Sequence, residues 1–264
     1  MSGKDYWAER TARAQAAITD KNIKQIERQM RKYYKTAMHY IIDDFERTHN
    51  KILKAVENGK EPTPADLYKL DKYWQMQGQM QAELKKLGAK QLINLARVFE
   101  INYFEIYHSI NIDGLKAYNT LDKEAVQQMI NQIWVADGQS WSNRVWQNTE
   151  YLAQTLNEEL IQCVTTGKTT SELKEKLQER FAVSYSNADM IARTELSHIQ
   201  TQAARQRYED YGIKQVEVWA DKDERRCKQC GKLHQTKYFV TDKMPVPVHP
   251  RCRCSIIPVI DELR

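Results

Sequence analysis

Proline is missing from most of this chain. The sequence has 264 residues and six prolines, none of them between residues 65 and 244. Because proline removes a backbone donor and clashes with the preceding helical turn, its absence leaves this long span free to form helices. Glycine is also scarce and recurs at helical lengths, at positions 59, 88, 114, 138, 167 and 212. We therefore expect a mostly helical body whose helices end near these glycines.

Long apolar runs are missing as well. No stretch of about 18 consecutive apolar residues occurs, so the sequence predicts no membrane-spanning helix. The N-terminal residues lack the apolar core of a secretory signal. We therefore expect synthesis in a reducing compartment, where cysteines bind metal more often than they form disulfides.

A large net charge is missing too, and the small positive excess is concentrated in one segment. The formal net charge is +5, and residues 221–254 contain nine Lys/Arg and four Asp/Glu, so that nine minus four accounts for the whole excess. Local basic charge is typical of contact with nucleic acid or an acidic protein surface, although a solvated rim is an equal alternative. The candidate nucleic-acid contacts are Arg225, Arg226, Lys228, Arg251 and Arg253.

Hydrophobic periodicity predicts three long helices in the first 110 residues. The first covers about residues 4–58. Thr63-Pro64 predicts the N-cap and first turn of a second helix that runs to about Leu87. A third helix is expected after Gly88, reaching Ile106. The apolar stripes, expected in the core, include Met30, Tyr34, Trp74, Leu84 and Phe99.

Capping residues predict the next helices. Asp122 can cap a short helix through Ile130 and Trp134, and a long helix follows Gly138. Thr169 and Glu172 have the spacing of a capping box and predict a helix start there.

A change of period marks the C-terminal part of the chain. Ser186 is expected to open a further helix that Gly212 ends. Beyond Gly212 the pattern alternates every second residue, which predicts a strand over 216–220 and further strands over 237–241 and 254–259. The predicted fold class is α+β, with long helices followed by a small β-rich module.

Four of the five cysteines lie within residues 227–254. Cys227 and Cys230 form one C-x2-C pair, and His249 and Cys252 repeat the two-residue gap, with Cys254 as a fifth candidate ligand. Such gaps fold knuckles that direct their donors at one point, and two knuckles complete the tetrahedron of a structural zinc site. The sequence therefore predicts structural Zn²⁺, with disulfides or a catalytic metal as alternatives. It leaves open which four of the five ligands bind.

A second candidate metal pair is weaker. Glu195-x-x-His198 matches the ligand spacing of carboxylate-bridged metal helices, but those sites need a second such pair. Since none is evident, a salt-bridged or capping role is the better interpretation.

Several spaced elements over about residues 140–260 resemble a known family. Ala192-Arg-Thr-Glu195 lies on a predicted helix, and a strand ending near Trp219 follows. Next come Asp223-x-Arg225-x-Cys227-x-x-Cys230 and His249-Pro-x-Cys252-Arg-Cys254. In this order they resemble the Mu F-type head morphogenesis domain of tailed bacteriophages and prophages, whose members are called minor head or minor capsid proteins. One departure is His234-Gln235, where these proteins often have a glycine.

The resemblance implies a structural protein incorporated in the prohead, associated with the portal and acting in head assembly and in DNA packaging or ejection. The implied partners are the portal protein and a major capsid or scaffolding protein, with packaged DNA as a further candidate and no membrane. The implied location is the virion, at the head interior or portal vertex, after synthesis in the bacterial cytoplasm.

We predict three regions: a helical docking region (1–139), the helical part of the head-morphogenesis domain (140–212) and a β-rich zinc module (213–264). We also expect the C-terminal part to fold alone with zinc, with no extra domain after Val259. No catalytic residues are predicted.

Two alternative functions are a nucleic-acid-binding zinc protein and a nuclease or toxin-type enzyme on the same scaffold. A metal-independent nuclease needs a positioned acid–base pair. Near the cysteines only Glu224, His234 and His249 qualify, and His249 is expected to bind zinc.

Overall fold

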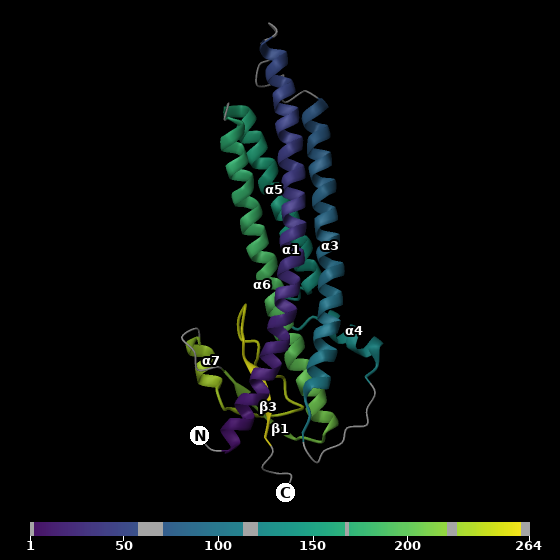
Figure 1. Cartoon of the computed structure of the whole chain (residues 1–264), viewed down its shortest axis with the longest axis vertical. Coiled ribbons are helices and arrows are strands. Elements are labelled where there is room, and N and C mark those ends of the chain that lie inside the picture. The colour runs from purple at the N-terminus through teal and green to yellow at the C-terminus, as the bar shows by residue number, and fades with distance from the viewer. Residues whose placement is uncertain (1–2, 58–70, 113–120, 167–168, 221–225, 260–264) are drawn as a thin grey trace. The chain divides into compact units, whose positions relative to one another are not determined.

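The computed structural model describes residues 3–57, 71–112, 121–166, 169–220 and 226–259 (Figure 1). Its long helices are α1 (Gly3–Glu57), α3 (Asp71–Ser109), α5 (Trp141–Thr166) and α6 (Thr170–Asp210). Shorter elements are α4 (Lys123–Asn131), α7 (Lys228–Leu233), β1 (Gln215–Trp219), β2 (Lys237–Phe239) and β3 (Ser255–Pro258). The prediction of a mostly helical chain with a small C-terminal β region is therefore confirmed. Among the described residues, no helix combines the length and apolar character needed to cross a membrane.

The chain divides into two compact units, each built from segments that are distant in sequence. Unit 1 contains Met1–Glu27, Asn94–Trp141 and Met190–Arg264. Unit 2 contains Arg28–Ile93 and Ser142–Asp189. The C-terminal strands thus share a unit with the beginning of the chain.

Local capping explains three of the helix ends. Asp122 caps α4 by accepting a hydrogen bond from the Glu124 backbone N–H at 3.0 Å. Before α6, the Thr169 N–H donates to the Glu172 carboxylate at 2.8 Å, and the Glu172 N–H donates to the Thr169 hydroxyl at 3.3 Å. After α6, Gly212 adopts a positive φ of 73°, which glycine tolerates without strain. These three predictions are confirmed.

Gly88 does not end a helix, contrary to prediction. It lies inside α3, where the Trp146 ring of α5 occupies the space that a side chain would need. A β-carbon at this position would lie 2.6 Å from a ring carbon of Trp146. Gly88 is therefore explained by the close approach of two helices rather than by a chain turn.

Substituting Gly88 by alanine should destabilise unit 2 by about 1–3 kcal/mol, because the new methyl group overlaps the Trp146 ring. Gly78→Ala is the matched control: Gly78 is exposed on the same helix with no atom within 4 Å of the added carbon. The control should be neutral or stabilising by up to ~1 kcal/mol, because alanine has the higher helix propensity. Denaturant unfolding monitored by circular dichroism measures both, and equal stabilisation by the two substitutions would contradict a tight ring contact.

Ser186 also fails to start a new helix, because α6 is continuous across it. The buried face of α6 continues past this residue through Phe181, Ser184 and Ala188, which follow helical spacing. No glycine or proline interrupts residues 170–210, so packing of this face carries the helix through the serine.

Three smaller differences concern helix ends and burial. The predicted cap at Thr63-Pro64 lies outside the described residues. Helix α4 ends at Asn131, before Trp134. Trp74 was expected in the core, but 57% of its surface is exposed.

Unit 2 is a bundle in which parts of α1, α3, α5 and α6 run side by side (Figure 1). Its core includes Met30, Phe45, Leu84, Leu152, Leu156, Leu173 and Leu177. A buried polar contact joins three of the helices, because the Asn148 amide donates to the Ser184 carbonyl at 2.9 Å and to the Tyr34 hydroxyl at 3.2 Å. Burial raises the pKa of Tyr34 to about 12, so its hydroxyl keeps its proton.

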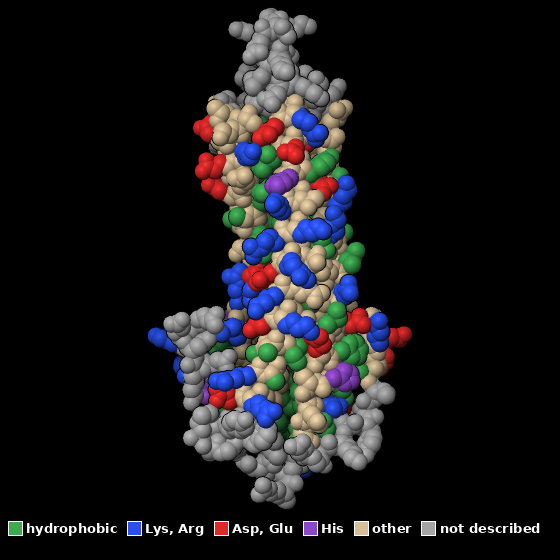
Figure 2. Space-filling model, viewed as in Figure 1, with side chains coloured by type: hydrophobic (Ala, Val, Ile, Leu, Met, Phe, Trp, Pro, Cys, Tyr) green, Lys and Arg blue, Asp and Glu red, His purple; other side chains and the backbone are tan. Residues whose placement is uncertain are grey.

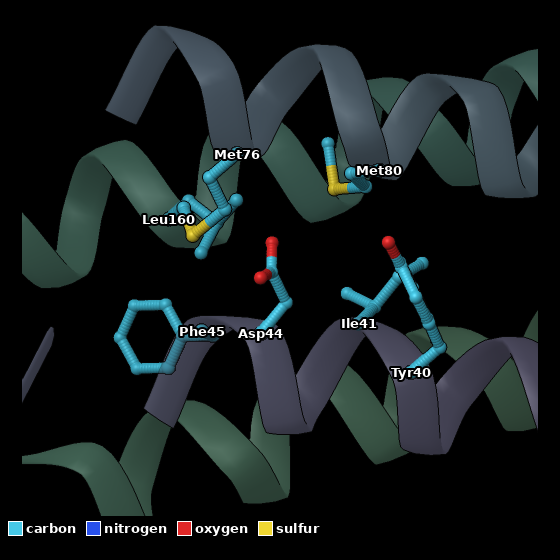
Figure 3. A pocket seen from close by; sticks show the side chains of 7 residues that line it. All are labelled: Tyr40, Ile41, Asp44, Phe45, Met76, Met80 and Leu160. Carbon is cyan, nitrogen blue, oxygen red and sulfur yellow. The ribbon is translucent and has the colours of Figure 1, made fainter. Parts of the chain in front are cut away.

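A shallow hollow in unit 2 shows how α1 and α3 face each other (Figure 3). It is lined by Tyr40, Ile41, Asp44, Phe45, Met76, Met80 and Leu160. Figure 3 shows Tyr40 and Ile41 beside Met80, and Phe45 on the side of Met76. The two helices are therefore antiparallel, with residue 40 level with residue 80.

Unit 1 contains an antiparallel sheet with the order β2-β1-β3. The predicted strands are confirmed, but β1 is buried on both faces: Val216 and Val218 on one, Glu217 and Trp219 on the other. The second face is covered by α1, because Ala12 packs against Trp219 and Ile257.

Buried hydrogen bonds connect α1 to the same C-terminal region. The Gln15 amide donates to the Tyr208 hydroxyl at 2.9 Å and to the Ile256 carbonyl at 3.3 Å. The Thr19 hydroxyl donates to Gln200 at 2.6 Å, and Gln200 donates to Ser255 at 2.7 Å. The first helix is thus part of the framework that holds β3.

Candidate metal centre

Two short segments bring the predicted ligands together. Cys227 is the N-cap of α7, and its sulfur accepts a hydrogen bond from the Cys230 N–H at 3.3 Å. The other segment is a turn before β3, in which the Cys252 N–H donates to the His249 carbonyl at 3.1 Å. Each C-x2-C or H-x2-C gap therefore forms the tight turn that its spacing predicts.

The donor atoms of the five predicted ligands form two overlapping groups. Cys227, Cys230 and His249 make one group, and Cys230, Cys252 and Cys254 the other, with donor atoms in each group within 4.8 Å of one another. The His249 Nε2 lies 3.3 Å from the Cys227 sulfur and 3.2 Å from the Cys230 sulfur. The Cys230 and Cys252 sulfurs are 3.8 Å apart. Two sulfurs bound to one tetrahedral zinc ion are also separated by about 3.8 Å, given Zn–S bonds of about 2.3 Å. This cluster could hold a metal ion.

His249 has the ring orientation that a metal ligand needs. Its Nδ1–H donates to the Pro250 carbonyl at 2.8 Å, since a carbonyl oxygen can only accept. In neutral imidazole this leaves the lone pair on Nε2, the nitrogen that faces the two sulfurs. The second ring nitrogen is thus fixed by a backbone carbonyl, an arrangement common among metal-bound histidines.

The thiols differ in how readily they lose their protons. Burial raises the pKa of Cys230 to about 12, whereas a hydrogen bond from Cys254 lowers the pKa of Cys252 to about 5. The Cys230 N–H lowers the pKa of Cys227, and donation to Cys252 raises that of Cys254. A bound dication would favour the thiolate form of every sulfur it contacts.

Burial separates the ligands from the basic residues between them. Cys230, Cys252 and Cys254 are buried, while Arg253, between the last two, is exposed. All five cysteines lie in the described residues, and none forms a disulfide. The cluster geometry does not reduce the five donors to four: it is compatible with leaving out His249, Cys252 or Cys254.

The predicted nucleic-acid contacts lie around this cluster. Arg226, Lys228, Arg251 and Arg253 are exposed, and Arg225 lies outside the described residues. A shallow pocket is lined by Ala220, Arg226, Cys227, Cys230, His249, Arg251, Arg253 and Cys254. The arginines therefore form a basic rim beside the sulfurs.

The structure gives Ala192-Arg-Thr-Glu195 a role that the sequence did not reveal. The Thr194 hydroxyl accepts a hydrogen bond from the Arg251 N–H at 3.1 Å, which ties α6 to the turn carrying His249 and Cys252. Arg251 has a positive φ of 60°, so this contact stabilises a backbone conformation that is rare outside glycine. Arg193 pairs with Glu27 of α1.

Glu195 and His198 do not belong to the metal cluster. Glu195 accepts a hydrogen bond from the Trp134 indole N–H at 2.9 Å, and His198 stacks on the Trp134 ring at 4.3 Å. Burial lowers the pKa of His198 to about 4, so it is neutral at pH 7. Trp134, which lies beyond the end of α4, is the partner that local sequence reasoning missed.

Comparison with known families agrees with this geometry. The family model described as Phage Mu protein F like protein matches residues 154–257. This segment matches a phage Mu F-like domain, and the match covers less than half of the chain. The resemblance predicted from the sequence is thereby confirmed for this part of the chain, and it indicates a role in phage head morphogenesis. No curated protein and no solved structure matches the chain.

The phage Mu F-like domain contains the whole candidate metal centre. It begins within α5, includes all of α6, β1, α7 and β2, and ends in β3. Helices α1, α3 and α4 lie outside the match, although α1 packs on β3.

Proposed function

We propose that this chain is a minor head protein of a tailed phage or prophage, incorporated in the prohead and associated with the portal. Its action would be in head assembly and in DNA packaging or ejection. The observation that carries the proposal is the phage Mu F-like match over residues 154–257, which encloses the cysteine and histidine cluster. Its location would be the head interior or portal vertex, after synthesis in the host cytoplasm.

The metal in this proposal is a structural zinc ion. Cys227, Cys230 and His249 would bind it together with Cys252 or Cys254. Five donors for a four-coordinate ion support a closed site rather than one with a position open for substrate. Zinc would then join α7 to the turn before β3.

Docking would rely on the helical surface, chiefly on residues 1–139. The partners proposed are the portal protein and a major capsid or scaffolding protein. A stable interface needs about 20–30 residues on each side, which long helices can supply.

A second candidate function is nucleic-acid binding at the basic rim, which the exposure of Arg226, Lys228, Arg251 and Arg253 supports. The enzyme alternative has less support. His249 faces two sulfurs, and the Nδ1 of His234 accepts a hydrogen bond from the Ala220 N–H at 3.3 Å. Glu224 lies outside the described residues.

Fractionation of proheads tests the proposed function. The protein, tagged and expressed from its own locus during phage growth, should sediment with purified proheads and copurify with the portal protein. Its ratio to the major capsid protein should be low. Absence from both proheads and mature virions would contradict the proposal.

A further inference from the structure

The helical part of the chain carries a second basic surface, separate from the cluster rim. The sequence contains no Asp or Glu from Arg28 to Ile42, nor from Leu84 to Phe99. In unit 2, the exposed cations of these stretches are Arg28, Arg31, Lys32, Lys35, Lys85, Lys86 and Lys90. Figure 2 shows Lys and Arg side chains gathered over α1 and α3 on the face in view. We call these seven residues the α1/α3 basic face.

Antiparallel packing places the two halves of this face side by side. Because residue 40 is level with residue 80 and both helices rise about 1.5 Å per residue, Lys35 is level with Lys85 and Arg31 with Lys90. Arg28 to Lys35 spans about 10 Å, and packed helix axes lie about 8–10 Å apart. The seven cations are therefore spread over the solvent-facing sides of both helices: Lys85 and Lys90 lie about 140° apart around α3, and the Arg31 guanidinium lies over the Tyr185 ring of α6.

Few acids of this unit compensate the charge. Two acids directly precede the two stretches. Glu27, next to Arg28, pairs with Arg193. Glu83 is 8% exposed and pairs at 3.2 Å with Lys86, a cation of the face itself. The other two helices of unit 2 carry the opposite excess: residues 142–166 have one arginine and three glutamates, and residues 170–189 have three cations and four acids. Outside residues 221–254 the positive and negative charges are equal in number, but they are unevenly distributed between the helices.

We propose that the α1/α3 basic face binds the phosphate backbone of double-stranded DNA without sequence preference. Duplex DNA carries one negative charge per about 1.7 Å of its axis, so about 10 Å of duplex presents roughly six phosphates. A surface meets only the phosphates on its own side of the duplex, so the exposed cations of the face are at least as numerous as the phosphates they would meet. Protein–protein interfaces, by contrast, are depleted of lysine and centred on aromatic anchors. Among the apolar residues of these two stretches, Met30, Tyr34 and Leu87 are buried in the bundle, whereas Tyr40 and Ile93 are exposed.

The contact would be to phosphates rather than to bases. Both helices are packed in the bundle along their length, so neither can enter a groove as a separate recognition helix. Phosphate contacts carry no sequence information, and their strength depends steeply on salt. DNA binding can be measured with the purified protein alone, so the result does not depend on whether the protein enters phage heads.

The test compares two triple variants of the full-length protein. Arg28→Gln, Lys32→Gln and Lys35→Gln together remove three cations of the face. The control, Lys123→Gln, Lys174→Gln and Lys176→Gln, removes the same charge from residues paired with Glu100, Glu46 and Glu179. Fluorescence anisotropy with a mixed-sequence duplex gives the affinity and its dependence on salt. The salt range is about 50–200 mM, because over this range about 6–10 phosphate contacts change the affinity by orders of magnitude.

The first variant should reduce the salt slope by about 3 and weaken binding at ~100 mM salt on the order of 100-fold. The control should retain most of both. Equal loss in the two variants would assign the effect to net charge, and an unchanged slope would place the contact elsewhere. In particular, a slope reduced only by Arg226→Gln, Arg251→Gln and Arg253→Gln would place it at the cluster rim. Displacement of DNA by an acidic polypeptide of equal charge, as effectively as by duplex competitor, would overturn the assignment to DNA in favour of an acidic protein.

Discussion

Replacing Cys230 with serine should release about one zinc ion per chain and unfold the C-terminal part of unit 1. Cys230 is shared by both groups of donor atoms and is 5% exposed, so its loss removes a buried ligand from each group. Structural zinc sites have apparent binding free energies of about 10–16 kcal/mol, and most of this free energy stabilises the folded state. Cys227→Ser should act in the same direction.

Elemental analysis and near-ultraviolet circular dichroism measure these effects. Cys163→Ser is the matched control, because Cys163 is equally buried but lies on α5 in unit 2. It should retain the full metal content. The pair Cys252→Ser and Cys254→Ser then identifies the fourth ligand, since only one of the two should lose the ion.

Acidification should also release the metal, because protons compete with it for the sulfurs and for the Nε2 of His249. Metal content should therefore fall as the pH decreases and recover on neutralisation with added zinc. Freshly reduced wild-type protein that contains no metal at neutral pH would refute the zinc assignment.

Deleting residues 1–27 should disrupt the C-terminal sheet even when zinc is present. The deletion removes Ala12 from the Trp219 and Ile257 cluster. It also leaves Tyr208 and Gln200 without their partners Gln15 and Thr19. Buried polar groups that lose a partner cost about 1–3 kcal/mol each, and the exposed apolar surface adds to this. We therefore expect loss of cooperative unfolding and aggregation.

Point variants separate this effect from a general consequence of shortening the helix. Thr19→Ala should lower the free energy of unfolding by about 1–3 kcal/mol, whereas Asp20→Ala, on the exposed side of the same turn, should change it by less than ~0.5 kcal/mol. If the deletion variant unfolds at the same temperature as the wild type, α1 is not part of the C-terminal framework.

This packing changes how docking must be tested. From sequence, we expected the C-terminal zinc module to fold alone and residues 1–139 to act as a separate docking region. Because α1 covers β1 and β3, an isolated C-terminal fragment that failed to enter proheads would not distinguish lost docking from lost folding. Substitutions at exposed residues of unit 2 within the proposed docking region, such as Trp74 or Ile93, address docking without removing the framework.

Short-range signals in the sequence determined the helix starts at Asp122 and Thr169, the end at Gly212 and the two knuckles of the cluster. Each of these depends on atoms within about four residues, so the local chain contains all the information needed. The positions of the strands followed from their period for the same reason. The family resemblance likewise came from ordered motifs along the chain.

Tertiary structure alone decided the features whose partners are distant in sequence. Gly88 resembles a helix end until Trp146 is placed against it, and Glu195 resembles half of a metal site until Trp134 supplies its hydrogen bond. The α1/α3 basic face likewise depends on antiparallel packing, which brings the cations of residues 28–35 in α1 level with those of residues 85–90 in α3. The physical reason is the same in each case: a side chain's role is set by the groups that surround it after folding, and along the sequence those groups are tens of residues away.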